Sequence, residues 1–323
     1  MKAWQVTQWC NPDEMAFVDL PMPIPGPGQV RVKVAAAALN FLDTLMIEGK
    51  YQVKPPFPFT PGVEFSGVID AVGDGVLLKV GMPVAGQTQT GAYAEYLVTD
   101  ARQVAPLPAS VDLAEASTMP IVYPTAHLAL RDSGHLKEGE TVLVTAAAGG
   151  VGLAAIQLAK AWGAGKIIAI AGGAEKLAIC KEHGATDVFD YADPQWADQV
   201  KAAFPNGADI IIDMVGGDVA EKAFKLIAWR GRFIVVGFAG GTIPSMPLNR
   251  LLLKSATAAG VFWGAMAQKE PKFAQSVFQD LFSLLAQGRL KPIVNHRYPL
   301  AQAPQAMKDL AARKTTGKVI LTP

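Results

Sequence analysis

Cysteine and histidine are scarce in this chain. Among its 323 residues there are only two cysteines and four histidines. Two cysteines separated by half of the chain cannot build a disulfide framework or a structural zinc quartet. No histidine stands three or four residues from another, and none lies beside a cysteine. A catalytic zinc needs three protein ligands of the right type, so the sequence predicts that no metal is bound.

Charge and long apolar runs are also limited. Charged residues make up 18% of the chain, the net charge is +1, and no basic or acidic block is present. This argues against a nucleic-acid partner. Gly, Pro or a charge interrupts every apolar run before it reaches membrane-spanning length. The first residues also lack the apolar core of a signal peptide. We therefore expect a cytoplasmic protein without a nucleic-acid or membrane partner.

Half of the residues are hydrophobic, which is enough for one or two domains with large cores. Residues 1 to about 123 are rich in Pro and Gly and contain short runs typical of strands, at 30–34, 65–69 and 94–98. This pattern predicts a β-rich unit. From Thr141 to about Gly260, apolar strand-like runs alternate with helical patterns. That alternation predicts an α/β unit, a doubly wound parallel sheet covered on both faces.

The C-terminal tail contains a predicted helix at 272–287 and a strand-like run at 318–321. Its apolar content is too small for a core of its own, so we expect it to return to the N-terminal unit. The predicted domains are therefore 1–123 together with 262–323, and 124–261 inserted between them.

The α/β region is organised around residues 141–164. An apolar run, 141–145, predicts a buried strand, and apolar residues at helical spacing follow from Leu153. Between them lie Ala147, Gly149, Gly150, Val151 and Gly152. A strand, a glycine turn and a helix form the first half of a dinucleotide-binding unit. Gly149 would let a pyrophosphate approach the backbone, Gly152 would let the helix pack closely on the strand, and the helix N-terminus would present free N–H groups.

Further segments resemble one known family. They are Leu39–Asp43, Gly49–Tyr51, Thr60–Gly67, Gly91–Tyr96, Gly139–Leu143, Ala147–Gly152 and Gly260–Gly264. Their order and spacing are similar to those of the quinone oxidoreductase (zeta-crystallin-like) branch of the zinc-free medium-chain dehydrogenases/reductases. The resemblance covers nearly the whole chain. It implies a GroES-like β domain built from both ends of the chain, with a Rossmann domain between them. It also implies a homodimer, with residues 256–261 as a possible pairing edge.

The predicted cofactor is NADPH. NAD-selective sites place Asp or Glu at the end of the second strand, but here that position reads Ile170, Ala171, Gly172, Gly173, with Lys176 following. Small residues, free N–H groups and a cation favour a 2′-phosphate. The resemblance adds Tyr191 and Arg313 as contacts to this phosphate.

The resemblance also implies contacts near the nicotinamide end of the cofactor. Thr125 would lie near the ring, backbone groups would hold the carboxamide, and a glycine turn would lie by the ribose. The residues concerned, besides Thr125, are Val215, Gly216, Val236, Gly237, Phe238, Val261, Phe262 and Trp263. Phe238, Phe262 and Trp263 are also candidate walls for a flat acceptor, although core packing is an alternative for Trp263.

Without a metal, the charge that develops on a substrate oxygen must meet hydrogen-bond donors or a proton. Residues 40–51 offer an amide, Asn40, a carboxylate, Asp43, and a phenol, Tyr51. In related enoyl thioester reductases a tyrosine at this place is the proton donor, so Tyr51 and Asn40 are the catalytic candidates. A water molecule is the alternative donor. Asp43 is a candidate cofactor contact, or it fixes the loop through backbone N–H groups.

These observations predict an NADPH-dependent enzyme that transfers hydride to a quinone or an α,β-unsaturated carbonyl, a small-molecule substrate, without zinc. One alternative is an enoyl thioester (enoyl-CoA or ACP) reductase of the same superfamily. Another is a low-turnover NADPH-binding or RNA-binding protein of the crystallin type. The shape of the acceptor pocket depends on loops that spacing arguments cannot fold.

Overall fold

A computed structural model describes all of residues 1–323. The chain divides into two compact units, each with its own sheet. Unit 1 contains residues 1–121 and 292–323, and unit 2 contains residues 122–291. Helix α3 (Met119–His127) contains the boundary between them.

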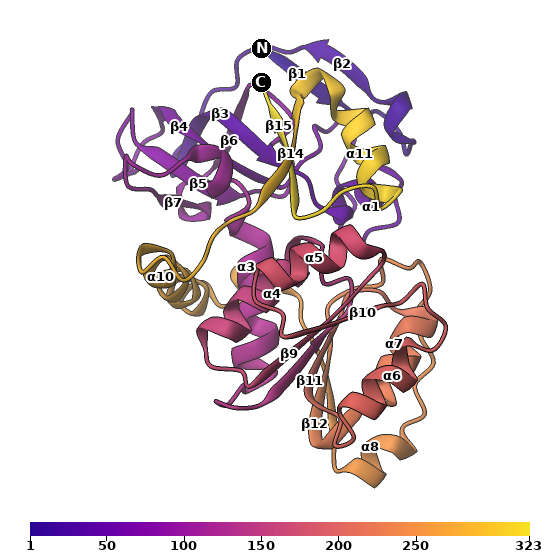
Figure 1. The fold of residues 1–323 in the computed structure, drawn as a ribbon. Coiled ribbons are helices and arrows are strands. Elements are labelled where there is room, and N and C mark those ends of the chain that lie inside the picture. Colours follow the sequence, from indigo (N-terminus) through magenta and orange to yellow (C-terminus); the bar gives the residue numbers. More distant parts are fainter. The chain divides into compact units, whose positions relative to one another are not determined.

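Unit 1 is built on a seven-stranded sheet with the order β14-β15-β3-β4-β5-β7, in which β6 also pairs with β3. Its longest strand, β3 (Gln29–Ala38), alternates buried Val30, Val32 and Val34 with more exposed residues, as expected for a strand that covers a core with one face. The C-terminal strand β15 pairs antiparallel with β3, so the two ends of the chain share one sheet (Figure 1).

The remaining elements of unit 1 are shorter than β3. The strands are β1 (Lys2–Gln5), β2 (Ala16–Asp19), β4 (Glu64–Val72), β5 (Pro83–Gln87), β6 (Tyr96–Asp100), β7 (Val104–Pro106), β14 (Val294–Pro299) and β15 (Lys318–Thr322); the helices are α1 (Phe41–Ile47), α2 (Leu113–Ala116) and α11 (Ala303–Ala311). This is the GroES-like β domain that the sequence implied.

Unit 2 is a six-stranded parallel sheet with the order β10-β9-β8-β11-β12-β13. The strands are β8 (Thr141–Val144), β9 (Lys166–Ala171), β10 (Asp187–Asp190), β11 (Ala208–Asp213), β12 (Ile227–Val235) and β13 (Thr257–Gly260). The helices after α3 are α4 (Gly150–Ala161), α5 (Ala174–Glu182), α6 (Trp196–Ala203), α7 (Gly217–Phe224), α8 (Asn249–Lys254), α9 (Trp263–Lys269) and α10 (Pro271–Ala286).

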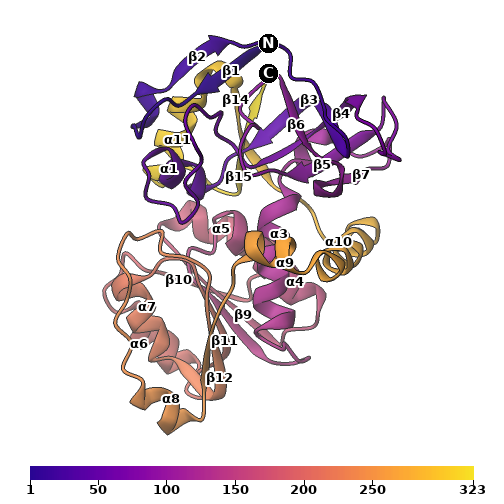
Figure 2. The same cartoon turned by 180° about the vertical axis from the view of Figure 1, so that it is seen from behind.

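The helices cover both faces of this sheet. Helices α4 and α5 lie on one face and α6 and α7 on the other, as the two opposite views show (Figures 1 and 2). Strands buried on both faces have apolar interiors, and the central strands β8, β9 and β11 have this character, with polar residues mainly near their ends. The doubly wound Rossmann fold predicted from the alternating pattern is therefore present.

The C-terminal boundary of unit 2 lies further along the chain than the sequence analysis predicted. Residues 262–291, which we expected in the β-rich domain, cluster with the Rossmann unit. Two contacts join this segment to the rest of unit 2. The His127 ring lies 3.0 Å from Asp280 Oδ2, and the Gln157 side-chain amide both donates to the Lys291 carbonyl oxygen and accepts the Lys291 N–H. The amphipathic pattern of α10 predicted the helix, but it did not predict the surface on which the helix packs.

None of the helices combines the length and the apolar run that a membrane crossing requires.

Candidate functional site

The carboxyl ends of the six parallel strands lie along one edge of the unit 2 sheet, and most of the predicted cofactor residues follow directly after them. These residues are Gly149–Gly152 after β8, Gly172 and Gly173 after β9, Tyr191 after β10, Val215 and Gly216 after β11, Val236–Phe238 after β12 and Val261–Trp263 after β13. Chain order reverses between β8 and β11. Open parallel sheets bind ligands at this edge, at the point where the order reverses.

The turn between β8 and α4 has the features of a phosphate site. A Cβ on Gly152 would lie 2.5 Å from the Ala147 carbonyl oxygen, so only glycine allows the helix to start this close to the strand. The helical hydrogen bonds begin with the Leu153 N–H, which donates to the Gly149 oxygen at 2.9 Å. The N–H groups of the first turn, at Gly150, Val151 and Gly152, therefore have no helical partner and are available to an anion.

A buried hydrogen bond joins the two strands where their order reverses. The Thr145 hydroxyl, just after β8, donates to Asp213 Oδ1 at the end of β11 over 2.6 Å. Asp213 Oδ2 accepts the Gly216 N–H at 2.9 Å, which fixes the turn that contains Val215 and Gly216. Burial raises the pKa of Asp213, and the hydrogen bonds from Thr145, Gly216 and Val215 oppose this shift. Sequence reasoning missed this pair because nothing in either segment identifies the other.

Four of the residues predicted to surround a 2′-phosphate, Gly172, Gly173, Lys176 and Tyr191, belong to unit 2. Gly173 caps helix α5 with φ at 85°, and Lys176 lies in the first turn of that helix. The Tyr191 ring lies so close to Gly172 that a Cβ there would be 2.9 Å from Tyr191 Cε2. One further residue, which the sequence analysis did not select, contacts this group: Asp190 Oδ2 accepts the Gly173 N–H at 3.0 Å.

The three candidate aromatic walls have different surroundings. Trp263 is buried and packs edge-to-face on Phe278, with ring centroids 5.6 Å apart, so it serves the core of unit 2. Phe262 is half-exposed, and Phe238 lines an apolar pocket together with Ile243. Thr125 is buried in α3. Core packing, the alternative named for Trp263, is in keeping with this contact of its side chain.

In unit 1, a buried ion pair holds Asn40. Lys318 Nζ, on the last strand β15, donates to Glu64 Oε2 at 2.7 Å, to Asn40 Oδ1 at 2.8 Å and to the Leu39 carbonyl oxygen at 2.8 Å. Asn40 Nδ2 donates to the same Glu64 oxygen at 2.9 Å and to the Ala38 carbonyl oxygen at 3.3 Å. The Lys318 and Glu64 side chains are both buried, and removal of either one would leave the other as an unpaired buried charge.

This network determines which way the Asn40 amide points. An ammonium group only donates and an ionised carboxylate only accepts, so Asn40 Oδ1 must face Lys318 and Nδ2 must face Glu64. Both N–H groups of Asn40 are then occupied inside the protein. A ligand that reaches this side chain can use only the remaining lone pair of the amide oxygen. Asn40 is thus arranged to accept a hydrogen bond, whereas the sequence analysis considered it as a donor.

Asp43 lies one turn further along α1. Its Oδ2 accepts the Asn40 N–H at 2.8 Å and the Tyr93 hydroxyl at 3.0 Å, while its buried Oδ1 has no partner. The bond to Asn40 has the geometry of a capping box and fixes the start of the helix. Burial raises the pKa of Asp43 to about 7, against the opposing effects of Asn40, Tyr93 and Lys318.

Tyr51 follows the end of α1 and is half-buried against the unit 1 core. Its N–H bonds the Leu45 carbonyl oxygen at 3.1 Å, which fixes the backbone of the loop. Burial, and then the nearby Asp43 carboxylate, raise the pKa of the Tyr51 phenol above its ordinary value. A tyrosine hydroxyl is protonated at neutral pH in any case, so it can donate a hydrogen bond, and the raised pKa makes it a weaker acid.

Arg313, the last predicted phosphate contact, belongs to unit 1 and lies after α11 in a left-handed backbone conformation. No group of three or more His, Cys, Asp or Glu side chains is gathered so that it could hold a metal ion. The buried carboxylate of Glu64 is bound to Lys318. The residues present therefore do not fit a zinc site.

Two family models match the chain. The alcohol dehydrogenase GroES-like domain matches residues 26–109, and the zinc-binding dehydrogenase model matches residues 150–285. Quinone oxidoreductase-like protein 2 of Rattus norvegicus is 40% identical over 286 residues, covering 88% of this chain and 82% of the relative. Human quinone oxidoreductase is 35% identical over 290 residues, covering 88% and 86%.

Solved structures agree. Quinone oxidoreductase of Escherichia coli, complexed with NADPH, has a TM-score of 0.93 and 29% identity, with full coverage of both chains. Quinone oxidoreductase of Thermus thermophilus, also solved with NADPH, has a TM-score of 0.88 and 33% identity over 100% of both chains. With its GroES-like and Rossmann units and this degree of identity, the chain belongs to the quinone oxidoreductase family of the medium-chain dehydrogenases/reductases.

Proposed function

We propose that the protein is an NADPH-dependent oxidoreductase that reduces a quinone or an α,β-unsaturated carbonyl without a metal ion. The observation that carries this proposal is the grouping of glycine turns and polar residues at the carboxyl edge of the unit 2 sheet. The quinone oxidoreductases of E. coli and T. thermophilus were solved with NADPH, which supports the same cofactor here.

Each part of the cofactor has candidate residues that fit it. The first turn of α4 would hold the pyrophosphate, and Gly172, Gly173, Lys176 and Tyr191 would surround the adenosine-ribose phosphate, with Arg313 as a further contact. The nicotinamide half would meet the other proposed residues, which are Asn40, Asp43, Thr125, Val215, Gly216, Val236, Gly237, Phe238, Val261, Phe262 and Trp263. The narrow fit at Gly152 and the free N–H groups beside it are the features that favour a phosphate.

Bound NADPH would supply the hydride. The chain's own residues would orient the reactants and manage the charge that appears on the substrate oxygen. Tyr51, whose hydroxyl is protonated at neutral pH, is the proposed proton donor to that oxygen or to the neighbouring carbon. Asn40, fixed by Lys318 and Glu64, would accept a hydrogen bond and so orient the donor that makes it. No step requires a metal, in keeping with the side chains present.

Steady-state kinetics with NADPH tests the proposal directly. The acceptors are a para-quinone, an alkenal and an enoyl thioester, followed by absorbance at 340 nm, and kcat/KM is compared between classes. We expect turnover with the quinone or the alkenal. A clear preference for the enoyl thioester would replace this assignment with an enoyl thioester reductase. If NADPH raises the Tm but no acceptor is reduced, the protein is a binding protein rather than an enzyme.

The role of Tyr51 is tested by Tyr51→Phe. Loss of a general acid lowers kcat by about 100-fold or more, whereas KM changes little. Tyr298→Phe is the matched control, because it also removes a hydroxyl from unit 1, one that bonds Asp309 at 2.9 Å. Equal kcat values for Tyr51→Phe and the wild type would assign proton delivery to water.

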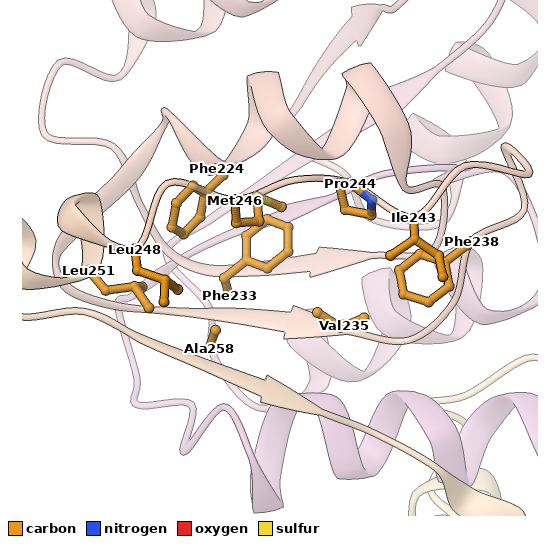
Figure 3. Close-up of a pocket in the computed structure, with 10 residues that line it drawn as sticks. All are labelled: Phe224, Phe233, Val235, Phe238, Ile243, Pro244, Met246, Leu248, Leu251 and Ala258. Atoms are coloured by element: carbon orange, nitrogen blue, oxygen red, sulfur yellow. The ribbon is translucent and has the colours of Figure 1, made fainter.

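We also propose a homodimer, formed through the open edge of β13, and a location in the cytoplasm, where the two free cysteines would remain reduced. Strand β13 ends the sheet and is mostly exposed. Beside it, apolar side chains from β12, β13 and residues 238–251 converge on a pocket, in which Ile243 and Leu248 are 74% and 72% exposed (Figure 3). An unpaired edge next to an exposed apolar patch is typical of an interface.

A further inference from the structure

The acid that is missing from the end of β9 is supplied by the neighbouring strand. NAD-selective Rossmann sites carry Asp or Glu at the end of the second strand, where this chain has Ala171 and Gly172. In the register of the parallel pair, Asp190 of β10 is the partner of Ala171. Neighbouring strands lie about 4.8 Å apart, so a side chain at the end of β10 can reach the turn that follows β9.

The Asp190 carboxylate does contact that turn. Its Oδ2 accepts the Gly173 N–H at 3.0 Å, and its Oδ1 accepts the Ala192 N–H at 2.8 Å. The carboxylate thus joins the turn after β9 to the turn after β10. The next residue, Tyr191, places its ring against Gly172. A negative charge therefore lies among the residues to which we assign the 2′-phosphate of NADPH.

We propose that Asp190 is a specificity-determining residue that limits the preference of this site for NADPH over NADH. The inference rests on the proposed function, because it requires that this edge binds a nicotinamide dinucleotide. Its carboxylate repels the 2′-phosphate and occupies the Gly173 N–H that the phosphate would use. A carboxylate has about four acceptor positions, so Asp190 can accept the 2′-hydroxyl of NADH in addition to its two N–H donors.

Two opposite charges then decide the preference. Lys176, in the first turn of α5, attracts the phosphate, as does the N-terminal end of that helix. Asp190 opposes both. Because Asp190 is only half-buried, its effect is reduced by solvent and salt, and it should amount to a change in relative affinity rather than exclusion of one cofactor.

The test is Asp190→Asn, with Kd for NADPH and for NADH measured by titration calorimetry at low and at moderate ionic strength. The amide oxygen of asparagine can still accept the Gly173 N–H, so the substitution removes the charge and keeps the turn. We expect the ratio of Kd for NADH to Kd for NADPH to rise roughly fivefold at low salt, and less at moderate salt.

Asp193→Asn is the matched control. Asp193 is a nearby carboxylate, half-buried like Asp190, that accepts hydrogen bonds from the Gln195 N–H and the Gln199 side chain, so its substitution removes the same charge without touching Gly173. Asp190→Ser, with a shorter acceptor, should shift the ratio in the same direction as Asp190→Asn.

An unchanged ratio in Asp190→Asn, or an equal shift in Asp193→Asn, would overturn the inference. A wild-type protein that binds neither cofactor would instead overturn the proposed function, so the two failures are distinguishable.

Discussion

Asp43 is a buried acid with one oxygen that has no hydrogen-bond partner. Its pKa is raised to about 7 because burial penalises the charged form. Between the unfolded value near 4 and this value, the folded state holds a proton that the unfolded state has released. The free energy of unfolding should therefore fall as pH rises from about 4 to 7, by about 1.4 kcal/mol for each unit of the shift.

Asp43→Asn tests this, because asparagine has no proton to lose. We expect the Tm of the variant to increase relative to that of the wild type as pH rises from 5 to 8. Tyr93→Phe is the complementary variant. It removes a hydroxyl that stabilises the Asp43 carboxylate, so the pKa of Asp43 should rise further. The loss of stability with rising pH should then extend to higher pH in this variant than in the wild type. Parallel Tm curves for Asp43→Asn and the wild type would show that Asp43 is ionised throughout.

At the same scale, sequence reasoning found some residues of the site and missed others. Asn40, Asp43 and Tyr51 were selected because they lie in one short segment that resembles a family motif. Lys318 was missed, although it fixes Asn40, because its partner Glu64 is 254 residues away along the chain. No local pattern distinguishes a lysine that will be buried on a final strand from an exposed one.

At the scale of elements, the β8–α4 turn makes a prediction about both stability and binding. In Gly152→Ala the new Cβ would lie 2.5 Å from the Ala147 oxygen, so the backbone must move. We expect a loss of about 1–3 kcal/mol in the free energy of unfolding, and a weaker Kd for NADPH.

Gly149→Ala separates these two effects. Its Cβ would meet only the Ala146 oxygen, at 3.3 Å, and its φ of −82° suits any residue. The variant should therefore lose much less stability without cofactor than Gly152→Ala, but it should bind NADPH less tightly, because we expect the added methyl group to lie where the pyrophosphate approaches. Titration calorimetry gives the Kd for NADPH of each variant, and thermal unfolding without cofactor gives its Tm. Unchanged NADPH affinity in both variants would place the cofactor elsewhere.

The elements themselves were largely predictable. The strand expected at 141–145 is β8 (Thr141–Val144), and the helix expected at 272–287 is α10 (Pro271–Ala286). Apolar runs and helical periodicity are local properties, so the sequence records them directly. The pairing of Asp190 with Ala171 is not local. The sequence analysis therefore found no acid at the end of β9 and could not show that β10 places one beside it.

At the scale of the whole molecule, the open edge of β13 makes the proposed dimer testable. The Val261 N–H bonds the Val235 oxygen of β12. Alternate residues of a strand point their N–H groups the same way, so Ala258 directs its N–H to the open edge. Ala258→Pro should remove one bond of an intersubunit ladder while leaving the pairing with β12 in place.

Light scattering after size exclusion gives the mass of each variant. We expect a dimer for the wild type and for the control Ala258→Ser, and a monomer or a weakened dimer for Ala258→Pro. A monomeric wild type at micromolar concentration would contradict the proposed dimer.

The sequence by itself determined the two kinds of domain, the glycine turn of the Rossmann unit and the family resemblance, because each depends on spacing within short segments. Tertiary structure decided that residues 262–291 pack on the Rossmann unit, that Lys318 and Glu64 orient Asn40, and that Asp190 lies against Gly173. These features depend on contacts between segments far apart in the chain. Sheet order and helix packing, rather than local propensity, determine which of those segments meet.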